Sequence, residues 1–542
     1  MRISRVSPAL AMLLLAVSAV VASGSDHAPV VTDRLKTTAA MSALPSDFNG
    51  DGVEDRVIGV PSDKTDRLYS SGGFHVLYSP GHDGTMPSSQ YFTTQSPSMQ
   101  KLLKMYPTGF GSTIASGDFD RDGYADVAVS VHGYDEPDEA KQRINVGGIV
   151  VIYGTDHGLD VNAAQPARVW SQDSAGVQGV SEDDDAFGSS LVVGDFDGDQ
   201  FLDLAIGIEG EQVGAKARQE GAVTVLYGGR AGLTARDQIV DQDTRGILDV
   251  AETGDWAGHA MAAADFNADG VDDLALGVFS EGVDGKPNAG AVNVIYGTKN
   301  VGLTGRGDRF VSQALDSIPG DADKNDWFGA TLTVGDFNGD SSDDLVVGAP
   351  DDTVGGFEDS GSATYIPGST SGLVLARSTS LALGQVSSGG GGAHFAAALA
   401  AGDVNGDGYD ELAVSSPWFD RVDVFPGSPD GPTATGVRTL TPDQLDEPAL
   451  DPGWGSFGVA LQFAHLDTQP GEDLLVGMAH ANVTVDGTKI QSGAVAEISS
   501  RSGVLDSSAH RLYYQGAAAV PGTAVKWEEF GAALPGSGLY IR

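Results

Sequence analysis

Short apolar runs alternate with Gly- and Asp-rich segments along most of the chain. The runs are four to eight residues long and rich in Val, Ile, Leu and Tyr, as in LVVGD at 191–195, DLAIGI at 203–208 and GAVTVLYG at 221–228. Runs of this kind, punctuated by Gly, predict β-strands, and no segment sustains the 3.6-residue period of an amphipathic helix. The chain is therefore expected to be all-β.

One acidic pattern, D-x-[DN]-x-D-G-x-x-D, recurs between these runs at intervals of 62 to 77 residues. Its copies begin at Asp47, Asp118, Asp195, Asp265, Asp336 and Asp403, and a degenerate copy, HLDTQPGED, begins at His465. A nearly fixed period of this length is the signature of a repeat architecture.

The flanks of the acidic pattern repeat as well. One strand precedes it, a compact apolar strand follows it, and a third strand of the GAVxVxYG type and a weaker fourth strand complete the unit. Seven units of four antiparallel strands predict a seven-bladed β-propeller. Stacked sandwich domains are the rival fold, but each would need about seven strands of its own.

Phe-Gly pairs or their equivalents are offset from the acidic loops. They begin at Phe110, Phe187, Ala257, Phe328, Phe395, Phe457 and Phe530. The first loop has no Phe-Gly before it, and the last Phe-Gly has no acidic loop after it. We therefore expect the C-terminal FGAALPG strand to complete the blade that residues 47–90 begin, which removes an open sheet edge.

The acidic pattern supplies the ligands that Ca²⁺ prefers. Calcium takes six to eight hard oxygen ligands, and a tightly curled loop turns alternate side chains inward, with Gly at position 6 allowing the bend. Positions 1, 3, 5 and 9 offer side-chain oxygens and position 7 a backbone carbonyl, so we expect about six calcium sites. The expected ligands are Asp47, Asn49, Asp51, Val53, Asp55, Asp118, Asp120, Asp122, Tyr124, Asp126, Asp195, Asp197, Asp199, Phe201, Asp203, Asp265, Asn267, Asp269, Val271, Asp273, Asp336, Asn338, Asp340, Ser342, Asp344, Asp403, Asn405, Asp407, Tyr409 and Glu411.

Two other interpretations of these loops stay open. Mg²⁺ is the weaker alternative, because it demands octahedral geometry and retains its waters. Asp, Asn and Gly also fill ordinary β-turns, although turn preference does not require acids at positions 1, 5 and 9 in every copy.

The copies differ in detail. Gln200 and Ser341 replace the position-6 Gly and predict strained loops, and position 9 of the last full copy is Glu411, for which the adjacent Asp410 could substitute. The seventh copy has His465 and Gln469 at positions 1 and 5, so we expect it to bind no calcium.

Composition narrows the classes of partner and chemistry. The chain carries 75 Asp and Glu against 31 Lys and Arg, a net charge of −44, so nucleic acid and anionic membrane surfaces are not expected partners. The sequence contains no Cys, which excludes disulfides, thiolate catalysis and Cys-ligated metals.

The N-terminal region predicts export. Arg2 and Arg5 precede an apolar stretch from about Ala9 to Val21, followed by small residues, which is typical of a cleaved signal peptide. A membrane anchor is the rival interpretation, but the stretch is shorter than the ~20 residues of a span. We expect a signal peptide at 1–22, a linker at 23–38, a propeller at 39–542, and a secreted, extracellular protein without a membrane span.

The combination of Phe-Gly, the Asp loop and GAVxVxYG resembles the FG-GAP repeat of integrin α-subunit N-terminal domains, a seven-bladed propeller also found in secreted bacterial proteins. The resemblance covers about 45–542. It implies calcium in the Asp loops on one face and ligand contacts on the opposite face. We expect no counterpart here of the integrin leg domains, membrane span and disulfides. The ligand-contact loops would include 131–146, 173–186, 208–220, 241–256, 279–289, 312–327, 349–360 and 443–456.

Function is less constrained by the sequence than fold. We expect a monomeric binding or adhesion module for an extracellular protein or glycan; the alternative is a hydrolase or lyase acting on polysaccharide or lipid on the face opposite the calcium loops. We assign no catalytic residue, because no HExxH or G-x-S-x-G motif occurs.

Arg306-Gly307-Asp308 is expected in a polar turn, without functional meaning. Four Trp that precede Phe-Gly positions are expected to pack between blades, with an aromatic ligand platform as the alternative: Trp256, Trp327, Trp454 and Trp527.

Overall fold

The structure is a computed structural model. It describes residues 43–63, 71–79, 88–103, 107–134, 144–214, 219–385, 390–448, 450–451, 453, 456–517 and 519–536. The expected signal peptide, the linker and Trp454 lie outside the described residues. The chain divides into two compact units, Met1–Met41 and Ser42–Arg542, and every described residue belongs to the second. The helices described there are too short or too polar to cross a bilayer.

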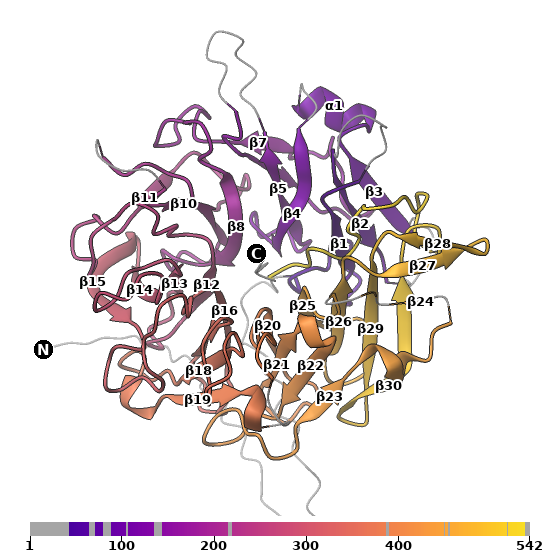
Figure 1. The fold of residues 1–542 in the computed structure, drawn as a ribbon. Helices are drawn as coiled ribbons and strands as arrows, with labels where there is room; N and C mark the ends of the chain where they lie inside the picture. Colours follow the sequence, from indigo (N-terminus) through magenta and orange to yellow (C-terminus); the bar gives the residue numbers. More distant parts are fainter. Residues whose placement is uncertain are drawn as a thin grey trace, which may run out of the picture. The chain divides into compact units, whose positions relative to one another are not determined.

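Antiparallel sheets follow one another along the chain (Figure 1). The first sheet has three strands, β1 (Arg56–Val60), β2 (Gly73–Leu77) and β3 (Ser89–Thr93). The second contains β4 (Thr108–Gly117), β5 (Asp126–Gly133), β6 (Ile149–Ile152) and β7 (Arg168–Trp170). The third contains β8 (Phe187–Gly194), β9 (Asp203–Ile208), β10 (Ala222–Leu226) and β11 (Asp237–Val240). The fourth contains β12 (Met261–Ala264), β13 (Asp273–Val278), β14 (Ala291–Thr298) and β15 (Gly302–Val311).

The later sheets repeat this order. The fifth contains β16 (Thr331–Gly335), β17 (Asp344–Ala349), β18 (Ser362–Ile366) and β19 (Thr379–Ala382). The sixth contains β20 (Leu399–Gly402), β21 (Glu411–Ser416), β22 (Arg421–Phe425) and β23 (Arg438–Leu440). The seventh contains β25 (Leu461–Ala464), β26 (Asp473–Met478), β29 (Ala494–Arg501) and β30 (Val504–Tyr513). An accessory sheet joins β24 (Leu450–Asp451) to β27 (Asn482–Val485) and β28 (Thr488–Gln491).

Helical structure is confined to short segments between strands. They are α1 (Pro97–Leu103), η1 (Leu375–Arg377), η2 (Leu383–Gln385), η3 (Pro417–Phe419) and η4 (Pro442–Leu445). The described residues thus form an all-β fold of six four-stranded sheets and one three-stranded sheet, besides the accessory sheet. This sheet count fits the seven blades that the sequence predicts.

Successive sheets pack through their first strands: β4 contacts β8, β8 contacts β12, and the series continues through β16 and β20 to β25. Second strands such as β9 and β17 are buried at every position, because each lies between two neighbouring sheets. This explains their unbroken apolar runs. Backbones approach closely at Gly277, where an added Cβ would lie 2.3 Å from the carbonyl oxygen of Gly329.

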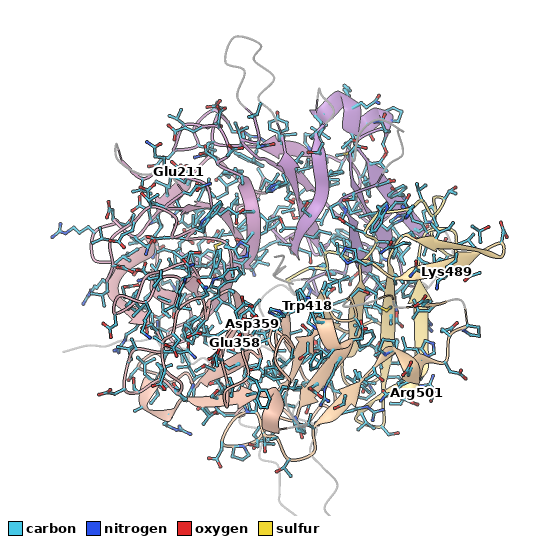
Figure 2. The ribbon with its side chains drawn as sticks, in the orientation of Figure 1. Glu211, Glu358, Asp359, Trp418, Lys489 and Arg501 are labelled. Carbon is cyan, nitrogen blue, oxygen red and sulfur yellow. The ribbon has the colours of Figure 1, made fainter. Side chains whose placement is uncertain are left out.

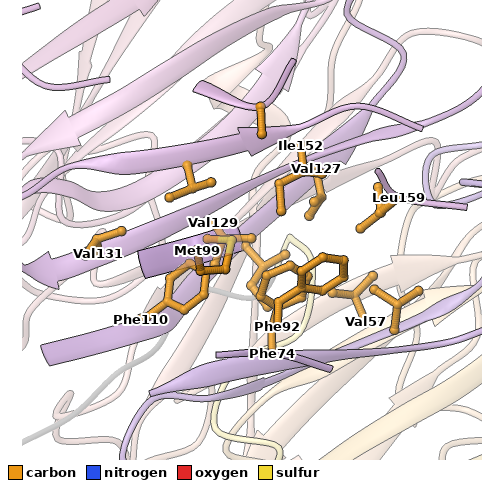
Figure 3. Close-up of a cluster of buried hydrophobic side chains, with 14 of the residues drawn as sticks. Val57, Phe74, Phe92, Met99, Phe110, Val127, Val129, Val131, Ile152 and Leu159 are labelled. Carbon is orange, nitrogen blue, oxygen red and sulfur yellow. The ribbon is translucent and has the colours of Figure 1, made fainter. Parts of the chain in front are cut away.

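Aromatic and branched side chains fill the space between the first and second sheets (Figure 3). Phe74 stacks on Phe92 with ring centroids 4.8 Å apart, and Phe110 meets Phe74 edge-on at 5.6 Å. Phe110 belongs to a Phe-Gly pair, so the repeated Phe is a core residue of the inter-sheet interface. The same role falls to Phe187 and Phe328, which are also fully buried.

The C-terminal segment pairs with β1, at the edge where the first sheet lacks a fourth strand. Gly531 N donates to Gly59 O at 3.0 Å, and Gly59 N donates to Ala533 O at 2.9 Å. Gly258 N to Gly277 O, at 3.3 Å, and Gly277 N to Ala260 O, at 2.9 Å, form the same pair of bonds in the fourth sheet. The expected closure by FGAALPG is therefore present, and it joins the two ends of this unit.

A buried ion pair reinforces that closure. Arg56 Nε lies 2.5 Å from Glu497 Oε2, with both side chains buried, and so links β1 to β29. Burial alone would raise the pKa of Glu497, but the hydrogen bond and charge of Arg56 outweigh it and lower that pKa. Breaking such a pair leaves an uncompensated buried charge, which makes it costly.

The Arg306-Gly307-Asp308 tripeptide lies within β15, at a register irregularity opposite Val294 and Tyr296, and not in a turn between strands. Asp308 is buried, and its Oδ2 accepts hydrogen bonds from Leu248 N at 2.7 Å and Asn293 Nδ2 at 3.2 Å. The expectation of a turn was wrong because the strand bulges there to bring Asp308 to these donors. The Asp308 carboxylate therefore makes its hydrogen bonds inside the protein.

Candidate metal centres and central cavity

Six acidic loops immediately precede second strands, and those at Asp118, Asp195, Asp265, Asp336 and Asp403 form the hairpins between first and second strands. Backbone bonds connect neighbouring loops: Ala125 N to Asp47 O at 2.9 Å, Asp272 N to Asp195 O at 3.0 Å, Asp410 N to Asp336 O at 3.1 Å, Glu472 N to Asp403 O at 3.1 Å, and Glu54 N to His465 O at 2.9 Å. The loops therefore lie beside one another at the same end of the sheets.

The Asp118 loop shows how the sequence curls its acids inward. Asp118 Oδ1 and Oδ2 accept hydrogen bonds from Asp122 N at 3.2 Å and Gly123 N at 3.1 Å, and Asp122 Oδ1 accepts one from Tyr124 N at 3.0 Å. Ligand atoms of Asp118, Asp120 and Asp122 all lie within 4.8 Å of one another. Burial, together with the charges of Asp122 and Asp118, raises the pKa of Asp120 to about 6. Three carboxylates this close together repel one another, so the cluster favours the binding of a cation.

The Asp195 loop brings Asp195, Asp197 and Asp199 equally close. Here Arg236 Nη1 also lies 2.5 Å from Asp197 Oδ2, with the guanidinium over the Tyr227 ring at 4.0 Å. The sequence pattern did not reveal this partner, because Arg236 lies just before β11, outside the loop. The guanidinium partly neutralises the negative charge of this loop.

The position-9 carboxylates accept backbone hydrogen bonds that the sequence pattern does not indicate. In the Asp195 loop, Asp203 Oδ2 accepts from Phe196 N and Asp203 Oδ1 from Gly228 N, both at 2.9 Å. Buried position-9 acids at Asp55, Asp126 and Asp273 make the same two kinds of backbone contact. These carboxylates hold the loop to the third strand, and their remaining lone pairs can serve a cation.

Loops that depart from the pattern behave in two ways. Gln200 and Ser341 adopt φ of 76° and 71°, the left-handed region that Gly occupies in the other loops, so the expected strain is present. Glu411 accepts from Val404 N at 2.8 Å and fills position 9 itself. Asp410 does not substitute for it, because Asp410 Oδ2 accepts from Asp336 N, at 2.8 Å, in the neighbouring loop.

The remaining position-5 and position-1 acids fit a hard cation. Asp51 Oδ2 is buried and has no hydrogen-bond partner among the described residues, which is costly unless a ligand is present. Burial and the charge of Asp51 raise the pKa of Asp47. The loop beginning at His465 offers an imidazole at position 1, with Nε2 3.8 Å from Glu472 Oε1. This loop offers far fewer oxygen ligands than the six acidic loops.

The position-9 acids give the calcium-free protein a characteristic pH dependence. Burial raises the pKa of Asp203 and Asp273 to about 8 and of Asp344 and Glu411 to about 7. In the unfolded chain these groups ionise near pH 4. A raised folded-state pKa stabilises the fold at low pH, and this contribution is lost as the pH rises from about 4 to about 8.

We therefore expect the melting temperature in chelator to fall as the pH rises through this window. Saturating calcium should flatten or reverse the slope, because the cation binds the ionised form. Calorimetric scans across the window, with and without calcium, measure both slopes. Identical slopes in the two conditions would contradict the assignment of these acids to cation sites.

A central cavity of about 680 Å³ lies at the other end of the sheets. Its lining includes Ser62, Thr108, Ser189, His259, Ala397 and Val459, so several sheets contribute. These residues come from the beginnings of first strands or from just beyond second strands, whereas the acidic loops join the opposite ends of the same strands. The cavity and the acidic loops are therefore on opposite faces.

Polar chemistry converges on this cavity. His259 Nδ1 lies 2.8 Å from Glu209 Oε2, and Ser62 Oγ donates to Glu529 Oε2 at 2.7 Å. Burial would raise the pKa of Glu209, but the hydrogen bond and charge of His259 lower it. Trp418, which Figure 2 places toward the centre of the sheets, adds an aromatic wall. No sequence motif indicated this group, because its members are far apart in the chain.

The Trp residues before Phe-Gly positions have different environments. Trp327 packs against Phe279 with ring centroids 5.5 Å apart, as expected for inter-blade packing. Trp527 is 45% exposed and does not fill the core. The aromatic residue that lines the cavity is Trp418, which follows β21 and which the Phe-Gly pattern did not indicate.

Comparison with known proteins bears on the repeat and the fold. The FG-GAP repeat matches residues 110–153, 187–226, 328–366 and 395–436. Phosphatidylinositol-glycan-specific phospholipase D of Bos taurus is 33% identical over 183 residues, which are 34% of this chain and 21% of that protein. Integrin alpha-PS2 of Drosophila melanogaster is 30% identical over 256 residues, 46% of this chain and 16% of that protein. The chain thus spans about a fifth of the length of such curated relatives.

Among solved structures, rhamnogalacturonan lyase YesW aligns with 92% of this chain and 80% of its own, with 13% identity and a TM-score of 0.38. A likeness at that level supports no conclusion about this protein. The repeat matches, the curated relatives and the succession of four-stranded antiparallel sheets agree with one another. The chain therefore carries FG-GAP repeats in an all-β, integrin-alpha-like propeller fold.

Proposed function

We propose that this protein is a secreted, calcium-binding β-propeller that serves as a binding module for an extracellular glycan or protein. The observation that carries the proposal is the central cavity, in which imidazole, carboxylate, hydroxyl and indole groups converge opposite the acidic loops. Concave sites with a few converging polar groups are the usual form of small-ligand sites. The calcium loops would act as structural supports at the other face.

The cavity's chemistry favours a glycan over a protein surface. Hydroxyl-rich ligands need donors and acceptors such as His259, Glu209 and Ser62, and a flat aromatic face such as Trp418 suits the apolar face of a sugar ring. A volume of about 680 Å³ accommodates a small saccharide or the tip of a protein loop. The high negative charge favours a neutral or cationic ligand.

A glycan and surface-protein screen in calcium should identify a ligand whose affinity falls at least tenfold in Trp418→Ala and His259→Ala. His157→Ala is the matched control, because that imidazole is exposed and outside the cavity lining. Equal binding by all three variants would overturn the cavity as the ligand site. Binding lost only in chelator would indicate that the calcium loops hold the ligand instead.

A polysaccharide- or lipid-acting hydrolase or lyase is the second candidate, and the His259–Glu209 pair favours it. If Nδ1 carries the proton that Glu209 accepts, Nε2 can accept a proton from a ligand, the arrangement of a general base with its orienting acid. The phospholipase D named above acts on phosphatidylinositol-glycan, so such lipids belong in the substrate panel. Turnover that Glu209→Gln reduces at least tenfold, with ligand affinity retained, would favour the enzyme over the binding module.

A further inference from the structure

Three loops that lead from one sheet to the next share a buried glutamine. Gln172, Gln242 and Gln313 each lie two residues after the last strand of a sheet, and are 2%, 1% and 4% exposed. The Oε1 atom of each has no hydrogen-bond partner within the described parts of the chain. A buried carbonyl oxygen without a partner destabilises the fold, because it loses its hydrogen bonds to water. The same atom lacks a partner at the same position in three repeats, while the amide nitrogen of each glutamine contacts an acid.

Each glutamine adjoins an acid that lies three residues past the second strand of the following sheet. The amide nitrogens lie 2.5 Å from Glu211 Oε2, 3.3 Å from Glu281 Oε2 and 3.1 Å from Asp352 Oδ2, in chain order. The three acids are all partly or fully buried. Each pair therefore spans the junction between two sheets.

A further pair of acids closes the end of each loop. Asp185, Asp255 and Asp326 stand two residues before the Phe-Gly position, and each accepts a hydrogen bond from the backbone N of the acid three residues earlier. The donors are Glu182 at 2.5 Å, Glu252 at 2.6 Å and Asp323 at 2.5 Å. The repeated set is thus one glutamine and three acids.

The set around Gln242 is the most compact. Ligand atoms of Glu252, Asp255 and Glu281 all lie within 4.8 Å of one another, and Gln242 Nε2 is 3.2 Å from Asp249 Oδ2. Glu252 is exposed, so the group can be reached from solvent. Carboxylates gathered this closely repel one another unless a cation neutralises them.

We propose that Gln242, Glu252, Asp255 and Glu281 form a divalent-cation site of a second kind, separate from the acidic loops and suited to Ca²⁺. All four donors are hard oxygens, and a half-turn of the Gln242 amide presents Oε1 to the ion. Gln242 follows β11 and Glu281 follows β13, so the ion connects two sheets at the end opposite the acidic loops. The sets at Gln172 and Gln313 are expected to bind in the same way.

The site is not a general property of the repeat. At the entry to the sixth sheet, Ala393 stands two residues before Phe395, and Phe419 stands three residues past β21, where the other sets have acids. Both positions are apolar and cannot ligate a cation. The repeat can therefore form its sheet without these acids, and the donor set is present at some sheet junctions and absent at this one.

Calcium bound per chain, measured by equilibrium dialysis and metal analysis, tests the proposal. The wild type should bind more ions than its six acidic loops can hold, and Asp255→Asn/Glu281→Gln should bind one fewer than the wild type. Asp243→Asn is the control, an exposed acid of the same loop outside the donor set, and should keep the full count. An unchanged count in the double variant would overturn the site.

Terbium luminescence gives a second readout that leaves every ligand in place. Trp256 directly follows Asp255, so excitation of tryptophan should sensitise Tb³⁺ bound at this site. Trp256→Phe should remove a measurable part of the emission while keeping the wild-type ion count, and calcium should compete with terbium for that part. Emission that Trp256→Phe leaves unchanged would contradict the proposal, even if the double variant fails to fold. Loss of the acidic-loop sites alone would leave this emission intact.

Discussion

Removal of calcium by a chelator is expected to lower the melting temperature by on the order of 10–15 °C. A ligand present at about a hundred times its dissociation constant stabilises the native state by about 2.7 kcal/mol per site, and several sites act together. Acids such as Asp51 and Asp120 would otherwise remain close to like charges. Differential scanning calorimetry with calcium and with chelator measures the shift.

The specificity of that shift can be checked within the same protein. Asp122→Asn, which changes an intact loop, should lower the melting temperature in calcium and have less effect in chelator. Asp467→Asn in the degenerate seventh copy is the control and should behave as the wild type in both conditions. A wild-type melting curve that chelator leaves unchanged would refute stabilisation by calcium.

Loss of the C-terminal strand should have a comparable effect. Phe530 is fully buried among residues of β1, β26 and β29, and the following segment pairs with Gly59. Phe530→Ala should therefore reduce the free energy of unfolding by about 3–5 kcal/mol. Deletion of residues 527–542 should be more damaging, because it also opens a sheet edge.

Denaturant unfolding of both variants measures this contribution. Phe357→Ala, at an exposed position, controls for the loss of an aromatic side chain and should change stability by less than about 0.5 kcal/mol. A truncated protein that melts at the wild-type temperature would show that the C-terminal strand does not close the fold.

Features that repeat along the chain could be predicted from it. The strand succession and the closure at FGAALPG follow from periodicity, because each unit must bury two faces of its sheet against its neighbours. Phe48, Phe196 and Phe266, at position 2 of the acidic loops, are fully buried and anchor them, which explains why this position recurs. At these loops the acidic pattern and the buried Phe predict the same loop position between strands.

Features that depend on contacts between distant residues were not visible in the sequence. Arg236 reaches Asp197 from 39 positions away, and Asp410 serves the loop of the preceding sheet instead of its own. The pairing of His259 with Glu209 likewise depends on the approach of two sheets. Sequence spacing within one unit carries no information about such contacts.

Negative charge has more than one structural role in this protein. Some acids lie in the loops proposed to bind calcium, some, such as Asp410, bond to neighbouring backbone, and others surround the buried glutamines. A chain without Cys has no disulfides to hold its Gly-rich loops. Cations bound between carboxylates would supply that restraint.

The number of calcium ions lost from a single-loop variant tests the central claim most directly. Asp118→Asn/Asp122→Asn replaces two carboxylates of the compact loop of the second sheet with neutral amides, and Asp467→Asn serves as the matched control. Equilibrium dialysis followed by metal analysis should find one calcium fewer in the double variant and the wild-type count in the control. A wild-type count in both variants, or no bound calcium in the wild type, would contradict the assignment of the acidic loops as calcium sites.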